Sequence, residues 1–154
     1  YSLYTDPLEK ITVQEEITLL QTYIDIEQCR FQSELNVQIS ADKGCSSALM
    51  PSLLLQPLVE NALKHGIGNK NNIAIAVNFS CDDSRLHICV SDSGTGFNLP
   101  EPASRGIGMK NCQERLQLIY PGSSCFKLGN DEKGGAWICM SIPLELSEAN
   151  SREQ

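Results

Sequence analysis

The stretch "LLLQPLVENALKHGIG", residues 53–68, joins a strongly apolar sequence to a group of polar side chains. Spaced at 100° per residue around a helix, Glu60 and Lys64 share the polar side, where they could form an ordinary exposed ion pair. Asn61 and His65 fall at the boundary, and an amide at the edge of a core requires a partner. We therefore expect an amphipathic helix whose polar side is either a solvated surface or one wall of a binding site. The apolar side comprises Leu54, Leu55, Leu58, Val59, Ala62 and Leu63.

Hydrophobic spacing divides the rest of the chain into helices and strands. Residues at helical spacing follow the capping box "TVQE", in which Thr12 caps the helix and Glu15 reaches back. Pro51 stands where a proline favours the start of the next helix, and Pro57 lies inside that helix and could bend it. This order of elements favours the α+β class: a two-layer α/β sandwich with a mixed, mostly antiparallel sheet and helices on one face. The predicted helices cover 13–32, 51–66 and 107–120, and the predicted strands cover 35–40, 73–80, 85–92, 124–130 and 135–145.

The composition indicates one globular domain and argues against several classes of partner. The chain has 154 residues, of which 41% are hydrophobic and 20% are charged. Its net charge of -7 argues against a nucleic-acid groove. No apolar run approaches the roughly 18 residues of a membrane span. The chain has no signal peptide and does not begin with Met, so we expect a fragment of a longer protein.

The cysteines do not follow a metal-binding or disulfide-framework pattern. There are seven of them, no C-x-x-C occurs, and the chain has only two histidines, His65 and His87. Several lie among apolar neighbours, as in "HICV" and "WICM". The sequence therefore predicts buried free thiols in a reducing compartment. The seven are Cys29, Cys45, Cys81, Cys89, Cys112, Cys125 and Cys139.

Two glycine-rich loops supply the elements of a nucleotide site. In "DSGTG", residues 92–96, a strand ends in Asp92, whose carboxylate can accept a hydrogen bond from an exocyclic amine. The glycines beside it allow a flat ligand to approach the backbone. In "RGIGMKN", residues 105–111, backbone N–H groups at a glycine-rich helix start favour phosphate, and Arg105 or Lys110 could add charge. Each loop alone is also an ordinary turn, and neither is a Walker or Rossmann motif.

Taken in order, "LVENALKHG", "DSGTG" and "GIGMKN" resemble the N, G1 and G2 boxes of one ATP-binding domain. Gyrase, the ninety-kilodalton heat-shock chaperone, histidine kinases and MutL share that domain. The chain most resembles LytS-like sensor histidine kinases, through "LLLQPLVENALKHG", "YIDIEQCRFQSEL" and "GIGMKNCQERLQLIYPG". The resemblance covers about residues 12 to 145. It implies a Bergerat ATP-binding fold and the cofactors ATP and Mg²⁺.

The resemblance also implies a role for each residue of the boxes. Asn61 corresponds to the Mg²⁺ ligand, and an amide oxygen suits a metal that takes few protein ligands. Asp92 corresponds to the residue that reads the adenine amine. The other implied nucleotide contacts are Lys64, His65, Gly94, Gly96, Arg105, Gly106, Gly108 and Asn111, with residues 97 to 105 as a short lid.

Two departures from the wider superfamily bear on the chemistry. Gyrase-like ATPases carry a catalytic Glu four residues before the metal-binding Asn, and here that position is Pro57, which cannot act as a base. Glu60 could instead polarise the incoming nucleophile, or it could be a solvated helix carboxylate. Neither His65 nor His87 stands in the context of a phosphoacceptor, so the acceptor His is expected upstream of the fragment.

The resemblance implies a division of the chain and a set of partners. Residues 1–34 would end an upstream helical region, 35–146 would form the ATP-binding catalytic domain, and 147–154 would be a polar tail. Partners would be ATP, the upstream phosphoacceptor helix and a response regulator, in a protein that is a homodimer at full length. The location would be cytoplasmic, as part of a membrane-bound sensor. The alternatives are a gyrase-like ATPase, an anti-sigma-type serine kinase, or a degenerate module that only mediates interactions.

Overall fold

The fold is a five-stranded sheet covered by three helices. The computed structural model describes residue 6 and residues 8–30, 34–67, 72–93, 106–132 and 135–147. The five strands lie in the order β2-β4-β5-β7-β6, and a separate two-stranded sheet pairs β1 with β3. The elements along the chain are β1 (Lys10–Thr12), α1 (Val13–Arg30), β2 (Glu34–Ala41), β3 (Leu49–Pro51), α2 (Gln56–Ile67), β4 (Asn72–Cys81), β5 (Arg85–Asp92), α3 (Gly106–Ile119), β6 (Cys125–Asn130) and β7 (Ala136–Pro143).

The sheet is mixed and mostly antiparallel, as predicted. Only β2 and β4 run parallel, and the chain crosses between them through β3 and α2. The other three pairings are antiparallel, including the β4–β5 and β6–β7 hairpins. Because β5 is the middle strand, its end is held from both sides: Asp92 pairs with Ile75 on β4 and with Ala136 on β7.

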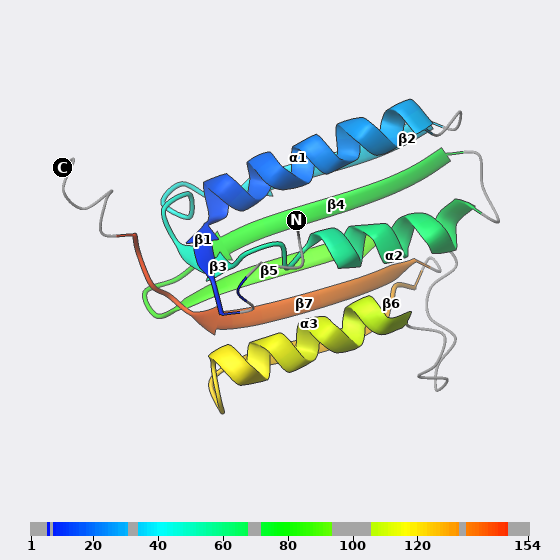
Figure 1. Cartoon of the computed structure of the whole chain (residues 1–154). Helices are drawn as coiled ribbons and strands as arrows, with labels where there is room; N and C mark the ends of the chain where they lie inside the picture. The colour runs from blue at the N-terminus through cyan, green and yellow to red at the C-terminus, as the bar shows by residue number, and fades with distance from the viewer. Residues whose placement is uncertain are drawn as a thin grey trace.

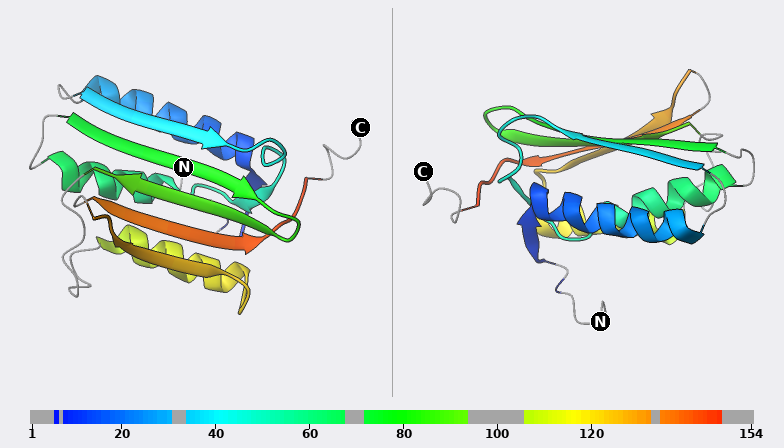
Figure 2. Two further views of the ribbon diagram at one scale, coloured as in Figure 1. Left: turned by 180° about the vertical axis from the view of Figure 1, so that it is seen from behind. Right: turned by 90° about the horizontal axis from the view of Figure 1, so that it is seen from above.

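All three helices lie on one face of the sheet, and no described element covers the other face (Figure 1, Figure 2). The strands show this arrangement in their burial, which alternates along all of β7 and along β5 up to Val90. Inward side chains such as Ile88 and Ile142 are fully buried beneath the helices. Outward side chains such as His87 and Cys139 are only half-buried. The predicted two-layer α+β sandwich is confirmed.

A single hydrophobic core lies between the helix layer and the sheet. Helix α1 contributes Val13, Leu20 and Ile24 to the same cluster that includes the apolar side of α2 and the inward residues of the strands. The predicted domain boundary between residues 34 and 35 stays a prediction. Helix α1 shares the core of this chain, but that does not show where the domains of the intact protein begin and end. None of the described helices is both long enough and apolar enough to span a membrane.

The start of α1 follows the capping box that the sequence predicts. The Thr12 hydroxyl accepts a hydrogen bond from the Glu15 backbone N–H at 3.1 Å. In return, a carboxylate oxygen of Glu15 accepts a bond from the Thr12 backbone N–H at 3.0 Å. Two of the first N–H groups of the helix region therefore have partners in the chain itself.

The start of α2 differs from the prediction. Pro51 belongs to β3, and α2 begins only at Gln56, so the predicted helix start at Pro51 is wrong. Between the two elements the backbone turns at Leu53, whose φ is 55°, a left-handed conformation that is uncommon for a leucine. Pro57 consequently lies in the first turn of α2, where a proline is tolerated, and not in its interior.

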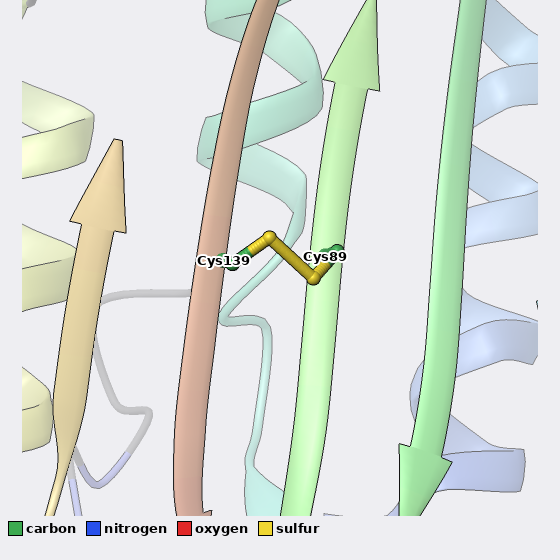
Figure 3. Close-up of a disulfide and its surroundings, with 2 residues drawn as sticks. All are labelled: Cys89 and Cys139. Carbon is green, nitrogen blue, oxygen red and sulfur yellow. A yellow bond between two sulfur atoms is a disulfide. The ribbon is translucent and has the colours of Figure 1, made fainter. Parts of the chain in front are cut away.

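The structure also corrects the prediction that all seven cysteines are free. Cys89 on β5 and Cys139 on β7 face each other and form a disulfide (Figure 3). Both side chains point to the open face of the sheet, away from the core. The prediction of buried free thiols holds for Cys45 and Cys112, whereas Cys29 is exposed and Cys81 and Cys125 are half-buried.

Candidate functional site

The described parts of the three predicted boxes belong to elements that meet at one end of the molecule. Strand β5 ends there, α2 runs toward it, and α3 and β4 begin there, as both views of the sheet show (Figure 1, Figure 2). Helix α2 contacts α3, β4 and β5, so the elements that carry the N and G2 boxes are neighbours over the central strand. Segments far apart in sequence thus bring their polar ends together on the helix side of the sheet.

Asp92 is the last residue of β5 and lies at the centre of this end. By strand alternation its side chain is on the helix side, in line with the buried Val90, and it is half-buried. Its backbone is closely packed: the β6–β7 turn brings Gly135 directly against its carbonyl group. The backbone position of Asp92 is therefore set by its ladder partners Ile75 and Ala136 and by the close approach of Gly135.

Helix α2 carries Glu60 and Asn61 on its half-buried surface. On α1, burial raises the pKa of Tyr23 to about 12, and the negative charges of Glu27 and Glu60 add to this effect. Glu60 is therefore within electrostatic range of α1. The backbones of Lys64 and His65 continue the helix toward the site, but their side chains are outside the described residues. Gly94, Gly96 and Arg105 are also outside them, so their predicted roles stay predictions.

Helix α3 begins at Gly106, one residue before the predicted helix start, and its phosphate-binding role stays a prediction. Gly108 packs directly on α2: a β-carbon at this position would lie 3.0 Å from Cβ of Pro57. Pro57 therefore forms a contact between the helices that carry the predicted N and G2 boxes. Asn111 follows on the exposed side of α3.

We expect Gly108→Ala to destabilise the protein by about 1 kcal/mol, because the proline ring is rigid and the start of α3 must move by a few tenths of an ångström. Helix propensity alone would make Gly108→Ala stabilising by up to about 1 kcal/mol. The contact with Pro57 instead predicts a loss of stability. Urea unfolding measures the difference. A stabilised variant would contradict the close packing of Gly108 on Pro57.

A buried carboxylate that was not among the predicted site residues holds the loop that leads into α2. Glu16 on α1 is 2% exposed. Its two carboxylate oxygens accept hydrogen bonds from the backbone N–H groups of Leu53, at 2.8 Å, and Leu55, at 3.0 Å. Burial raises the pKa of this carboxyl above its ordinary value, against the lowering effect of these bonds and of Arg115. The carboxylate therefore satisfies backbone donors at the start of α2 that would otherwise be buried without partners.

The same loop is held from the opposite side by α3. Arg115 donates a hydrogen bond of 2.8 Å from Nη1 to the backbone carbonyl of Ser52. Charged side chains from α1 and α3 thus fix successive residues just before α2. The sequence does contain a signal for Glu16. At helical spacing this charged residue falls on the same side of α1 as the apolar Val13 and Leu20. The capping box predicts a role for Glu15 only.

The cavity that the structure describes near this end lies on the other face of the sheet. It has a volume of about 390 Å³ and is bordered by outward residues of β2, β4 and β5 and by the β6–β7 turn. Asp92 contributes to it from the strand end, but the N-box and G2-box helices do not. It is therefore not the space between α2 and α3 in which the sequence places a nucleotide. Its lining comprises Asn36, Gln38, Ala74, Ile75, Ala76, Ser91, Asp92, Ser93, Asp131 and Gly135.

Comparison with known proteins identifies the family. The profile of the family described as "Histidine kinase-, DNA gyrase B-, and HSP90-like ATPase" matches residues 48–146. The chain belongs to this family. The matched segment runs from the residue before β3 to three residues after β7, so it includes α2, Asp92 and α3.

Sensor kinases are prominent among the curated relatives. The Sensor protein LytS of Enterococcus faecalis is 28% identical, over 92% of this chain and 26% of that protein. The sensor histidine kinase YpdA of Escherichia coli is 33% identical, over 78% of this chain and 23% of that protein. The chain thus spans about a quarter of the length of the curated relatives it matches. The resemblance to LytS-like sensor kinases is confirmed.

Solved structures share the fold. The catalytic domain of histidine kinase ThkA superposes with a TM-score of 0.69 at 14% identity, covering 90% of this chain and 98% of that domain. The mycobacterial sensor histidine kinase MprB gives a TM-score of 0.67 at 11% identity, covering 90% of this chain and 100% of that one. The predicted Bergerat-type architecture is therefore confirmed at the level of the fold.

Proposed function

We propose that this chain is the ATP-binding catalytic domain of a two-component sensor histidine kinase. In this role it transfers the γ-phosphoryl group of ATP to a His that lies outside residues 1–154. The observation that carries the proposal is the meeting of α2, the end of β5 and the start of α3 at one end of a chain that belongs to this ATPase family. The similarity to LytS along 92% of the chain supports the kinase branch over the others.

Each described residue of the site has a chemical role in this proposal. Asp92 accepts a hydrogen bond from the adenine amine, and its two ladder partners keep the carboxylate in place. Backbone N–H groups at the start of α3 bind phosphate oxygens, with the helix dipole favouring negative charge. Phosphoryl transfer needs positioning and charge neutralisation more than covalent chemistry from the protein. Lys64, His65, Gly94, Gly96, Arg105, Gly106, Gly108 and Asn111 complete the proposed nucleotide contacts.

The donor set fits Mg²⁺ bound together with the nucleotide. Among the described residues, no three His, Cys, Asp or Glu side chains gather into a metal site. A magnesium ion that travels with ATP does not need such a cluster, because phosphates and waters supply most of its ligands. The amide oxygen of Asn61, half-buried on α2, would be the protein ligand. When bound, the ion neutralises charge on the phosphates.

Pro57 and Glu60 are the two N-box residues that bear on whether the domain is a kinase or an ATPase. A proline in place of a catalytic carboxylate leaves no base for water at that position, which favours transfer to a protein acceptor. Glu60 is the remaining carboxylate of the N box, and it lies near Tyr23 on α1. We assign to it the polarisation of the incoming nucleophile, since α1 belongs to the region that we place next to the phosphoacceptor helix.

The proposed partners follow from the kinase assignment. The structure of ThkA in complex with the response regulator TrrA contains a domain that superposes on this chain with a TM-score of 0.64 at 14% identity, covering 89% of this chain and 42% of that one. By analogy, the intact protein would use its own response regulator and its upstream phosphoacceptor helix, and would act as a homodimer. The domain would lie on the cytoplasmic side of a membrane-bound sensor.

We expect isothermal titration calorimetry to detect binding of ADP and Mg–ATP, and Asp92→Asn to weaken it about 10- to 100-fold. The reason is the loss of a charge-assisted hydrogen bond to the adenine amine. Asp131→Asn is a matched control, because it removes the same charge from the exposed β6–β7 turn at the same end. Unchanged affinity in Asp92→Asn would refute its role, and no binding to the wild-type chain up to millimolar nucleotide would refute the proposal.

Two alternatives give different results in the same preparation. A gyrase-like ATPase would release phosphate steadily from the chain alone, whereas the kinase domain should not. A degenerate interaction module would bind no nucleotide. An anti-sigma-type serine kinase would bind nucleotide but phosphorylate a serine of a partner protein, so its product would be stable to acid, unlike phosphohistidine.

A further inference from the structure

Cys89 and Cys139 lie opposite each other on β5, the central strand, and its antiparallel neighbour β7. They are direct ladder partners of β5 and β7 and are 50 positions apart in the sequence. Their Cα atoms are 4.2 Å apart, close to the roughly 4.5 Å of a non-hydrogen-bonded antiparallel pair, in which side chains approach most closely. The register of the sheet therefore brings the two sulfur atoms together (Figure 3).

This pair is accessible, unlike the two most buried thiols of the chain. Cys89 and Cys139 are half-buried on the face that no described element covers (Figure 2). Cys45 and Cys112 lie in the core, where burial is the largest cause that raises each thiol pKa to about 12. Such thiols are almost wholly protonated at neutral pH and react poorly. Cys125, also half-buried on the open face, lies on β6 opposite Ser141 and does not face another cysteine in the register.

Lys127 and Arg85 share the open face with the pair, as does His87, whose ring contacts the Asp82 carboxylate. Lys127 on β6 is the ladder partner of Cys139 on the side opposite Cys89. Arg85 lies on the same open face, where its guanidinium donates to the carbonyl and hydroxyl oxygens of Ser141, two residues after Cys139. Neighbouring cations stabilise a thiolate, which is the form that attacks disulfides. Cys139 is therefore the better placed of the two to react first.

We propose that Cys89 and Cys139 form a reversible thiol–disulfide modification site that sets the stability of the β5–β7 pair. The co-reactant is a low-molecular-weight disulfide. The Cys139 thiolate attacks one of its sulfur atoms, which breaks the S–S bond and releases one thiol. The Cys89 sulfur then attacks the mixed disulfide at Cys139, forming the Cys89–Cys139 bond and releasing the second thiol. The two protons of the protein dithiol leave with the two released thiols, and a dithiol reductant reverses both steps.

The bond would act on the end of the sheet that carries Asp92. In β5, Cys89 precedes Asp92 by three residues, and in β7, Cys139 follows Ala136 by three, so both pairs belong to one ladder. A covalent link in this ladder opposes its opening and restricts the unfolded chain. Formation of this bond depends on the register, the exposure and the charges of the pair and does not require nucleotide binding at Asp92.

Differential alkylation followed by mass spectrometry tests whether the site exists and is reversible. The 154-residue protein is equilibrated with oxidised and reduced dithiothreitol in varied ratio, without denaturant, and free thiols are alkylated. Cys89 and Cys139 should lose alkylation together as the ratio becomes oxidising, and regain it together on reduction, while Cys125 stays alkylated throughout. Cys89 and Cys139 that stay alkylated under oxidising conditions, or that react only in urea, would overturn the proposal.

Thermal unfolding and hydrogen exchange test the consequence. The oxidised protein should melt about 5–15 °C above the reduced protein, and the Cys89→Ser and Cys139→Ser variants should lose this redox dependence. Cys125→Ser should retain it, which serves as the matched control. Amide protection should increase on oxidation in 85–92 and 136–143 but not in β2. A redox shift that persists in Cys89→Ser, or protection that changes equally in β2, would overturn the assignment to this pair.

Discussion

Replacing Gly135 by alanine is expected to reduce the free energy of unfolding by about 3 kcal/mol. A β-carbon on Gly135 would overlap the backbone carbonyl oxygen of Asp92 and lie 3.2 Å from its carbonyl carbon. Gly135 is buried, and its own carbonyl oxygen accepts a 2.7 Å hydrogen bond from the Asp131 N–H, so neither side can move without breaking contacts. Urea unfolding with linear extrapolation measures the loss.

Gly129→Ala is a matched control in the same hairpin. Its β-carbon would lie 2.6 Å from a ring carbon of Trp137, but this ring belongs to a half-buried side chain on the open face and can rotate away. We expect a loss of no more than about 1 kcal/mol. If Gly135→Ala were as stable as Gly129→Ala, the close backbone approach at Asp92 would be wrong. If Asp92 reads adenine, Gly135→Ala should also weaken ADP binding, whereas Gly129→Ala should not.

The elements that the sequence predicted well are those with a clear internal period. The alternation in "RLHICVSD" predicts β5 at its observed bounds, and the helical spacing of Met109, Cys112 and Leu116 predicts α3 to within one residue at each end. Their side chains also have the predicted burial, since the same period decides both the element and the face that packs. The two-layer architecture then follows from the number and order of these elements.

The predictions failed where the conformation depends on contacts between distant residues. Pro51 has the local properties of a helix start, but it lies in β3, which pairs with β1. Glu16 then binds the turn at Leu53, and α2 starts after that turn. The disulfide depends on the register of β5 against β7, which no spacing in the chain reveals. Of the site, the sequence indicated the end of β5, α2 and the start of α3, whereas Glu16 and Arg115 were missed because their partners are backbone atoms of another segment.

Replacing Glu16 by alanine is expected to cost about 3 kcal/mol of stability and to loosen the start of α2. The variant leaves the backbone N–H groups of Leu53 and Leu55 buried without the carboxylate that accepts from them, and each such donor costs about 1–3 kcal/mol. Glu15→Ala is the matched control, because it removes the adjacent carboxylate, which is exposed and serves only the capping box. Its cost should be about 0.5–1 kcal/mol. Urea unfolding of both variants measures the difference, and equal losses would contradict the role assigned to Glu16.

The pH dependence of the stability difference between wild type and Glu16→Ala gives a second test. Burial raises the pKa of Glu16 in the folded protein above its ordinary value of 4.5, so the unfolded chain loses this proton first as the pH rises. The contribution of Glu16 to stability is thus complete below about pH 4.5 and declines as the pH rises through the higher folded value. The stability gap between wild type and Glu16→Ala should therefore narrow from acidic to neutral pH. A gap that widens instead would mean that the backbone donors at Leu53 and Leu55, and not burial, dominate the environment of this carboxylate.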